Sequence, residues 1–171
     1  MSNDPSMLRD SVGLMLLRDL HAIEQQIAAY PDDESLWLVK PGISNSAGTL
    51  ALHIAGGLRH FIGAALGKSG YVRDRDAEFA NHQMSRADLG VVIESTIAEV
   101  GSALEALNST QIGAEYPIPV GPERITAQTS DMLLHLAVHL TYHLGQIDYH
   151  RRLLTADPQK LDTLSLRSLA R

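Results

Sequence analysis

The chain has 171 residues, of which 44% are hydrophobic, 20% charged and 5% aromatic, with no cysteine and a formal net charge of −6 at pH 7. This size predicts one domain over residues 1–171. The dominance of Leu and Ala favours helices over a sheet. The lack of cysteine excludes disulfides, thiolate metal ligands and a cysteine nucleophile, and the negative net charge argues against nucleic acid as a partner. The N-terminus has no secretory signal and no segment approaches the roughly 18 apolar residues of a membrane span, so we expect a cytoplasmic protein without membrane contact.

Apolar residues at helical spacing predict a first helix over about residues 5–30. Asp4 stands directly before Pro5, an arrangement typical of a helix N-terminus with proline in its first turn. The segment 31–42, PDDESLWLVKPG, contains two prolines and a glycine. We therefore expect it to end the helix and to form a connection.

A second helix is predicted over about residues 46–66, with Ser46 or the residue before it as the N-cap. Gly56 and Gly57 lie inside this helix, close to His53. Glycine in a helix costs about 1 kcal/mol relative to alanine. The pair therefore predicts either close packing or space left beside His53.

The polar segment 67–83 predicts a loop, and the alternating charges of 73–76 indicate side chains that pair with each other in solvent or clamp an anion or carboxylate. A third helix is expected over about 86–107, with Ser85 opening a capping-box signature. The prolines and glycines of the next segment, 108–126, predict a connection without helix.

The fourth predicted helix begins near residues 126–130 and ends at about 154, and a short C-terminal helix is expected from Pro158. The chain thus contains four long amphipathic segments joined by long, mostly polar connections. This pattern predicts an all-α fold, a four-helix bundle, in which metal sites are commonly built from side chains on facing helices.

Three histidines, His135, His139 and His143, recur every four residues on the fourth predicted helix. Side chains four apart share one helix face with Cβ atoms about 5–6 Å apart, which lets two imidazoles bind one metal ion. The apolar positions of this helix place His139 and His143 on its inward side and His135 at the edge. Two inward imidazoles need partners for their ring nitrogens. A shared metal would be one.

Two histidines alone make a weak site, because a catalytic zinc site has three protein ligands and a structural one has four. Further candidates are His53 and His60 in the second helix, His21 in the first helix and His82 in the loop. The repeated Glu-x-x-His pattern of di-iron bundles and the His-Glu-x-x-His motif of metalloproteases are both missing. The sequence does not place a buried carboxylate beside the histidines, so the residues indicate no general acid or base.

The segments LALHI at 50–54 and HLTYHLGQ at 139–146 resemble those of the DinB/YfiT-like superfamily of bacterial four-helix metal proteins. The segment YVRDRDAEF at 71–79 resembles a subgroup of its uncharacterised members. The similarity covers roughly residues 7–154, which we take as the core of the domain.

This resemblance implies a three-histidine site made by His53, His139 and His143, with the remaining coordination positions open to water or a ligand. It also implies a divalent metal, usually zinc or nickel, and a homodimer. Some relatives are thiol S-transferases that use a low-molecular-weight thiol such as bacillithiol, mycothiol or glutathione.

Each histidine also has an ordinary structural interpretation. His139 and His143 could be half-buried side chains that bond to carbonyls or waters, and His135 could be a border residue beside them. His60 and His150 are expected to be surface or edge histidines with satisfied hydrogen bonds.

The function therefore has two main interpretations. In the first, the metal lowers the pKa of a thiol or a water molecule, as in a thiol S-transferase or a hydrolase that acts on a small molecule. The thiol must then come from outside, because the chain has no cysteine. In the alternative, the protein is a non-catalytic metal-binding or stress-related helical bundle, or a dimerisation module.

Gln146, one turn beyond His143, could bond near the metal or to another helix.

Overall fold

The computed structural model describes residues 5–80, 84–121, 123–158 and 161. Within these ranges the chain is all-helical, and its only β structure is two isolated bridges in the segment before the last helix. The helices are α1 (Pro5–Ala28), α2 (Asp33–Trp37), α3 (Ala47–Leu58), the π-helix η1 (Arg59–Ala64), α4 (Arg75–Glu78), α5 (Arg86–Ala106), α6 (Ser109–Ile112) and α7 (Thr129–Thr155).

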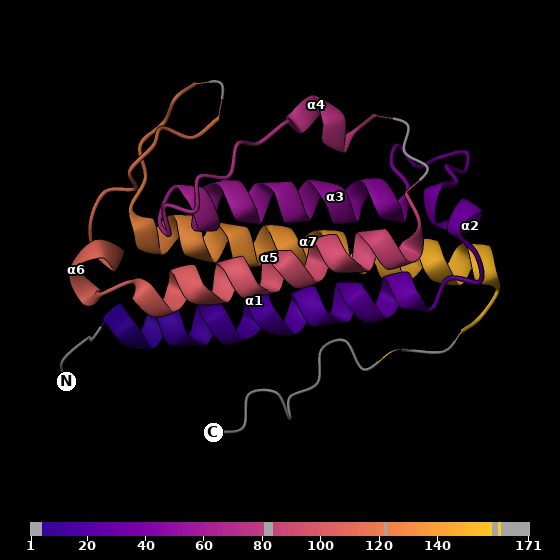
Figure 1. The fold of residues 1–171 in the computed structure, drawn as a ribbon, viewed down its shortest axis with the longest axis horizontal. Coiled ribbons are helices and arrows are strands. Elements are labelled where there is room, and N and C mark those ends of the chain that lie inside the picture. Colours follow the sequence, from indigo (N-terminus) through magenta and orange to yellow (C-terminus); the bar gives the residue numbers. More distant parts are fainter. Residues whose placement is uncertain (1–4, 81–83, 122, 159–160, 162–171) are drawn as a thin grey trace.

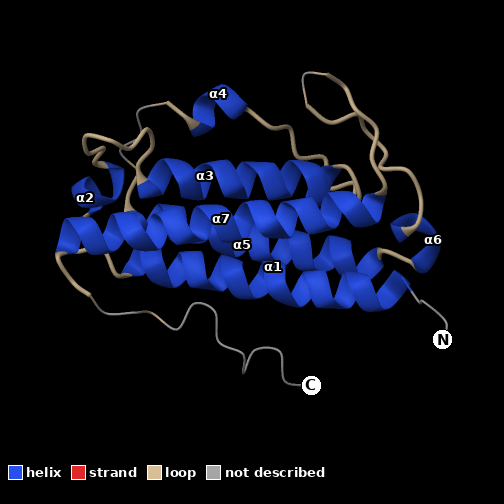
Figure 2. Ribbon diagram, turned by 180° about the vertical axis from the view of Figure 1, so that it is seen from behind, coloured by secondary structure: helices blue, strands red, loops and turns tan. Residues whose placement is uncertain are grey.

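The four long helices α1, α3, α5 and α7 lie side by side along the long axis of the molecule (Figures 1 and 2). Helix α1 packs mainly against α5 and α7, and α3 packs against the same two helices from the other side. The core fills the space between them with aliphatic side chains that are fully buried, such as Leu16, Ile23, Ile54, Leu58, Ile93, Val100, Leu133 and Leu140. No described helix is long and apolar enough to cross a membrane.

The long helices begin where the sequence predicts them. Ser46 accepts a hydrogen bond from the backbone N–H of Thr49, and Ser85 accepts one from the N–H of Asp88. Each serine thereby satisfies one N–H that the first helical turn leaves without a partner. The predicted cap Asp4, the loop histidine His82 and the C-terminal helix expected after Pro158 lie outside the described residues.

The connections contain three short helices, so the prediction that they are free of helix is wrong in part. Helices α2, α4 and α6 each follow an Asp or Asn whose side chain accepts a backbone N–H: Asp32, Asp74 and Asn108. Asn108 and Gln111 complete a capping box. These caps act within one turn; the prolines of the segments around α2 and α6 lie outside that turn, and the segment around α4 has no proline.

Helix α3 widens into η1 at its C-terminal end. The N–H of Ala65 donates to the carbonyl of His60 at 3.0 Å, and the N–H of Gly67 donates to the carbonyl of Ile62 at 2.9 Å. These bonds span five residues, as in a π-helix, instead of four. Helix α4 lies on the outer side of α3 (Figures 1 and 2). Arg73 before α4 and Phe79 after it both contact His53.

Candidate metal centre

Three histidines from two helices meet between α3 and α7. The candidate ligand nitrogens of His53, His139 and His143 all lie within 4.8 Å of one another. The Nε2 atoms of His139 and His143 are 3.1 Å apart, and the ring of His53 lies 5.3 and 5.4 Å from their rings, centroid to centroid. Two nitrogens bound tetrahedrally to one zinc ion at about 2.0–2.1 Å are about 3.3 Å apart. The three side chains are therefore close enough to hold one metal ion.

The two histidines of α7 are half-buried. Burial, with the charges of the neighbouring imidazoles, lowers the pKa of His139 to about 4. Burial also lowers the pKa of His143, although its hydrogen bond to Gln146 acts in the opposite direction. Both rings are thus neutral at pH 7, the form in which an imidazole nitrogen can bind a metal.

A buried carboxylate, which the sequence alone does not place, lies beside His53. Glu78, at the end of α4, is only 6% exposed, and its Oε2 lies 3.0 Å from Nδ1 of His53, whose side chain is 12% exposed. Arg73 donates from Nε to Oε1 of Glu78 at 2.6 Å and from Nη2 to Oε2 at 2.7 Å. Burial alone would raise the pKa of Glu78, but the hydrogen bonds from Arg73 and His53 outweigh it and hold the pKa below its ordinary value.

Gly56 of α3 makes room for this ion pair. A Cβ added at Gly56 would overlap the carboxylate of Glu78, whereas one at Gly57 would make an ordinary van der Waals contact with Nη2 of Arg73 at 3.7 Å. The predicted close packing beside His53 is therefore confirmed. The predicted pairing within residues 73–76 is wrong, because Arg73 pairs with Glu78 and Asp74 caps α4.

The sequence allows Gln146 to bond either near the metal or to another helix, and the structure places it beside the grouped histidines. Its Oε1 lies 2.6 Å from Nδ1 of His143. Because an amide oxygen only accepts, Nδ1 of His143 carries the proton and Nε2 keeps a lone pair that faces His139. A cavity of about 370 Å³ between residues 42–45 and the C-terminal half of α7 also reaches Gln146. Among its described lining residues are Gln146 and His150 but none of the three grouped histidines.

The other described histidines lie outside the group. His135 is exposed and stacks on His139 with a centroid distance of 6.0 Å. His60 contacts the ring of Phe61, and His21 is exposed near Glu24.

His150 corrects our expectation of a surface or edge residue, because it is 5% exposed. Its Nδ1 lies 2.6 Å from the hydroxyl of Tyr30 and its Nε2 lies 2.8 Å from the carbonyl of Leu38. Nε2 donates to that carbonyl, so Nδ1 accepts from Tyr30 and the ring is neutral. Burial lowers the pKa of His150 in agreement with this.

Comparison with known proteins gives one match. The model of the DUF1572 family, described as a protein of unknown function, matches residues 12–167 and so includes all the side chains of the candidate centre. Searches of curated proteins and of solved structures gave no match.

Proposed function

The chain belongs to the DUF1572 family, and we propose that its function is to bind one divalent metal ion through His53, His139 and His143 and to use it in a thiol S-transferase or hydrolase reaction. The convergence of three imidazoles within 4.8 Å is the observation that carries this proposal. Zinc and nickel are the metals we expect, because the DinB/YfiT-like superfamily that the chain resembles usually binds one of them; three imidazoles alone suit copper and iron as well.

The fold is also consistent with the proposed metal-binding function. Four long helices packed around one core, with the histidines on α3 and α7, are consistent with a four-helix bundle of the DinB/YfiT-like type. We propose this affiliation as the structural class of the domain. A homodimer remains part of the proposal, as expected for that superfamily.

The charge of the centre favours a role in chemistry. Three neutral imidazoles add no charge, and the ion pair of Glu78 with Arg73 is neutral as a whole. A divalent ion bound here would keep its full charge and would lower the pKa of a thiol or a water molecule at its open position. The protein itself would hold the ion and orient His53 and His143, and the thiol would come from a small molecule because the chain has no cysteine.

One observation favours the alternative of a non-catalytic metal-binding protein. Glu78 is the carboxylate that contacts the centre, but Arg73 holds both of its oxygens. It is therefore poorly placed to accept a proton from a substrate as a general base.

The test is metal analysis of untagged protein, with His139→Ala for comparison, followed by titration of the nickel-loaded protein with small thiols. We expect about one metal ion per chain in the wild type, little in the variant, and a thiol-dependent change in the nickel absorption spectrum. Metal binding without any response to thiols or electrophiles would favour the non-catalytic alternative. Failure to bind zinc or nickel would exclude both.

A further inference from the structure

We propose that Glu78 and Arg73 form a positioning pair for His53. In this proposal Glu78 accepts the Nδ1–H of His53 and thereby directs the Nε2 lone pair toward His139 and His143, while Arg73 fixes the carboxylate. The effect of this pair on metal affinity rests on the proposed function. Its effect on which nitrogen of the His53 ring carries the proton does not, because the position of that proton can be measured in metal-free protein.

The contacts of Nδ1 decide between the two neutral forms of the ring. Nδ1 of His53 lies 3.0 Å from Oε2 of Glu78 and 3.2 Å from Nη2 of Arg73. A carboxylate can only accept and a guanidinium can only donate, so the two neighbours favour opposite tautomers. If Nδ1 accepted from Arg73, the proton would sit on Nε2 and this nitrogen could not bind a metal.

Glu78 is the favoured hydrogen-bond partner of Nδ1. Arg73 already directs Nε and Nη2 at Glu78, at 2.6 and 2.7 Å, which is shorter than its contact with His53. The contact of Nδ1 with the carboxylate is also the shorter of its two contacts, 3.0 Å against 3.2 Å. The proton of His53 is therefore expected on Nδ1, with Nε2 free. A carboxylate that orients a histidine in this way is a common support of metal sites.

The segment that carries Glu78 is built around this contact. Asp74 caps α4, which ends at Glu78, and the ring of Phe79 lies 5.0 Å from the ring of His53. Gly56 leaves the space that the carboxylate occupies against α3. The hydrogen bond thus joins residues 25 positions apart in the sequence, within a contact that is nearly closed to solvent.

A second ion pair in the same protein supplies a matched control. Glu99 on α5 pairs with Arg59 of η1 at 2.9 Å and accepts from Oγ of Ser69 at 2.6 Å. It packs over Gly63 as Glu78 packs over Gly56. Among the described residues, the hydrogen-bond partners of Glu99 include no histidine, so replacing Glu99 changes a half-buried ion pair without touching the centre.

The experiment compares Glu78→Gln with Glu99→Gln in two measurements. Long-range ¹H–¹⁵N spectra of the metal-free protein report which ring nitrogen of His53 carries the proton, with His53→Gln used to assign its signals. Competition with a chromophoric chelator gives the zinc affinity. We expect protonated Nδ1 in the wild type, a mixture of tautomers in Glu78→Gln because an amide can present either O or NH₂, and zinc affinity about 10–100-fold lower. Glu99→Gln should match the wild type in both.

Several outcomes would overturn the proposal. One is a wild-type His53 with its proton on Nε2. Another is a Glu78→Gln protein with an unchanged tautomer and unchanged zinc affinity, or an equal loss in Glu99→Gln. If Glu78→Gln does not fold, Glu78→Asp keeps the charge but withdraws it from Nδ1, and the same shift in tautomer is expected. If the wild type binds no zinc, the proposed function fails while the ring spectra still decide the role of Glu78.

Discussion

Two carboxylates in this protein pack against glycines of the same helical segment, and they serve different ends. Glu78 lies over Gly56 in α3, and Glu99 lies over Gly63 in η1; in each case an added Cβ would overlap the carboxylate. Both acids come from other elements, α4 and α5. In both places, a missing side chain lets a charged group approach the helix backbone closely.

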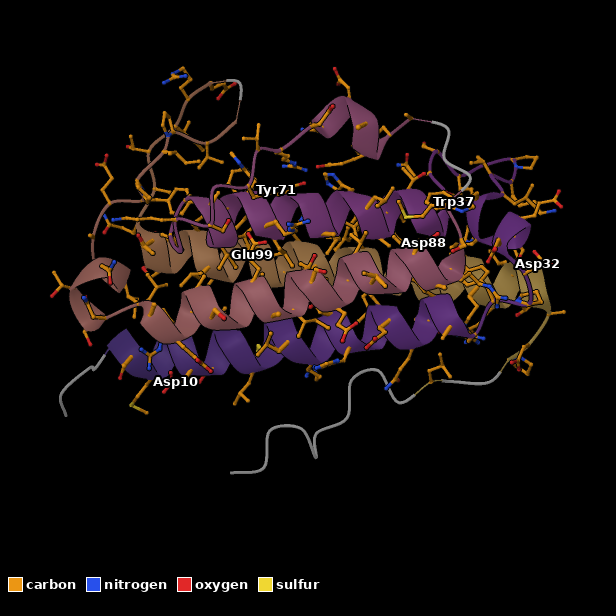
Figure 3. All side chains as sticks on the ribbon, viewed as in Figure 1. Asp10, Asp32, Trp37, Tyr71, Asp88 and Glu99 are labelled. Atoms are coloured by element: carbon orange, nitrogen blue, oxygen red, sulfur yellow. The ribbon has the colours of Figure 1, made fainter. Side chains whose placement is uncertain are left out.

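The two regions differ in what the carboxylate touches next. Glu78, held by Arg73, contacts His53. Glu99, held by Arg59, contacts Ser69, and Figure 3 shows Glu99 and Tyr71 in the same part of the molecule. Glu99 therefore ties η1, α5 and the loop at Ser69 together, and among the described residues no hydrogen bond or ion pair joins it to the grouped histidines. The comparison teaches that an ion pair anchors a loop in both places, but that only the pair of Glu78 and Arg73 also contacts a candidate ligand.

Among the variants that distinguish the histidine region from the region around Glu99, His139→Ala should have the largest effect on zinc affinity. Removing one of three ligands should reduce zinc affinity by more than about 100-fold, beyond the loss typical of an outer partner. Metal-free His139→Ala should unfold within about 1 kcal/mol of the wild type, because the ring is half-buried and the ion pairs remain. Metal analysis and chelator competition measure the first quantity, and urea denaturation measures the second. Stoichiometric zinc in the variant would rule out the centre as described.

Acid should weaken the metal-free protein through the histidine region. The pKa of His139 lies at about 4 in the folded state, below its ordinary value of 6.5. Between these values the unfolded chain binds more protons than the folded one, so the free energy of unfolding should fall as the pH falls from 6.5 to 4. Urea denaturation at stepped pH values measures this fall.

The matched variants for the pH series are His139→Gln and Glu99→Gln. The first removes one depressed histidine and should flatten the dependence between pH 4 and 6.5. The second leaves the histidines in place and should keep the wild-type slope in that window. An equal slope in wild type and His139→Gln would show that His139 does not cause it.

Replacing the two arginines by lysine should separate the regions by a smaller margin. Lysine keeps the charge but loses the fork that holds both carboxylate oxygens. Arg73→Lys should therefore loosen Glu78 and lower zinc affinity by about tenfold or less, since it acts one contact further from the metal than Glu78. Arg59→Lys should leave zinc affinity unchanged. Equal losses in the two variants would indicate a general effect on the fold.

The long helices were predictable because each buries an apolar stripe that repeats at helical spacing, and because Ser46 and Ser85 mark two of the starts. The short helices α2, α4 and α6 were missed. A single turn has no apolar periodicity to detect, and its stability comes from one cap and from packing on a neighbour. Asp32, Asp74 and Asn108 were the available signals, but Asp and Asn are equally common in turns.

The candidate site was partly visible for a similar reason. His139 and His143 share one helix, so their spacing alone brings them together, while His53 entered through the resemblance of its surrounding segment to a known family. Glu78 could not be placed, because its contact with His53 depends on how a polar loop folds back over α3. The one sequence signal for it was Gly56, which indicated space beside His53 but not its occupant.

The smallest effect on zinc affinity is expected in a comparison of Gly56→Ala with Gly63→Ala. This comparison tests directly whether the space at Gly56 matters for His53. Alanine gains about 0.5–1 kcal/mol of helix propensity over glycine, and displacing a packed group costs about 1–3 kcal/mol. Both variants should therefore lose a similar, small amount of stability in urea denaturation. Gly56→Ala alone should also push Glu78 from Nδ1 of His53 and lower zinc affinity a few-fold, by less than Glu78→Gln does. If Gly63→Ala weakened zinc binding as much, then the carboxylate over Gly56 would have no particular connection to the histidines, and the two regions would differ only in position.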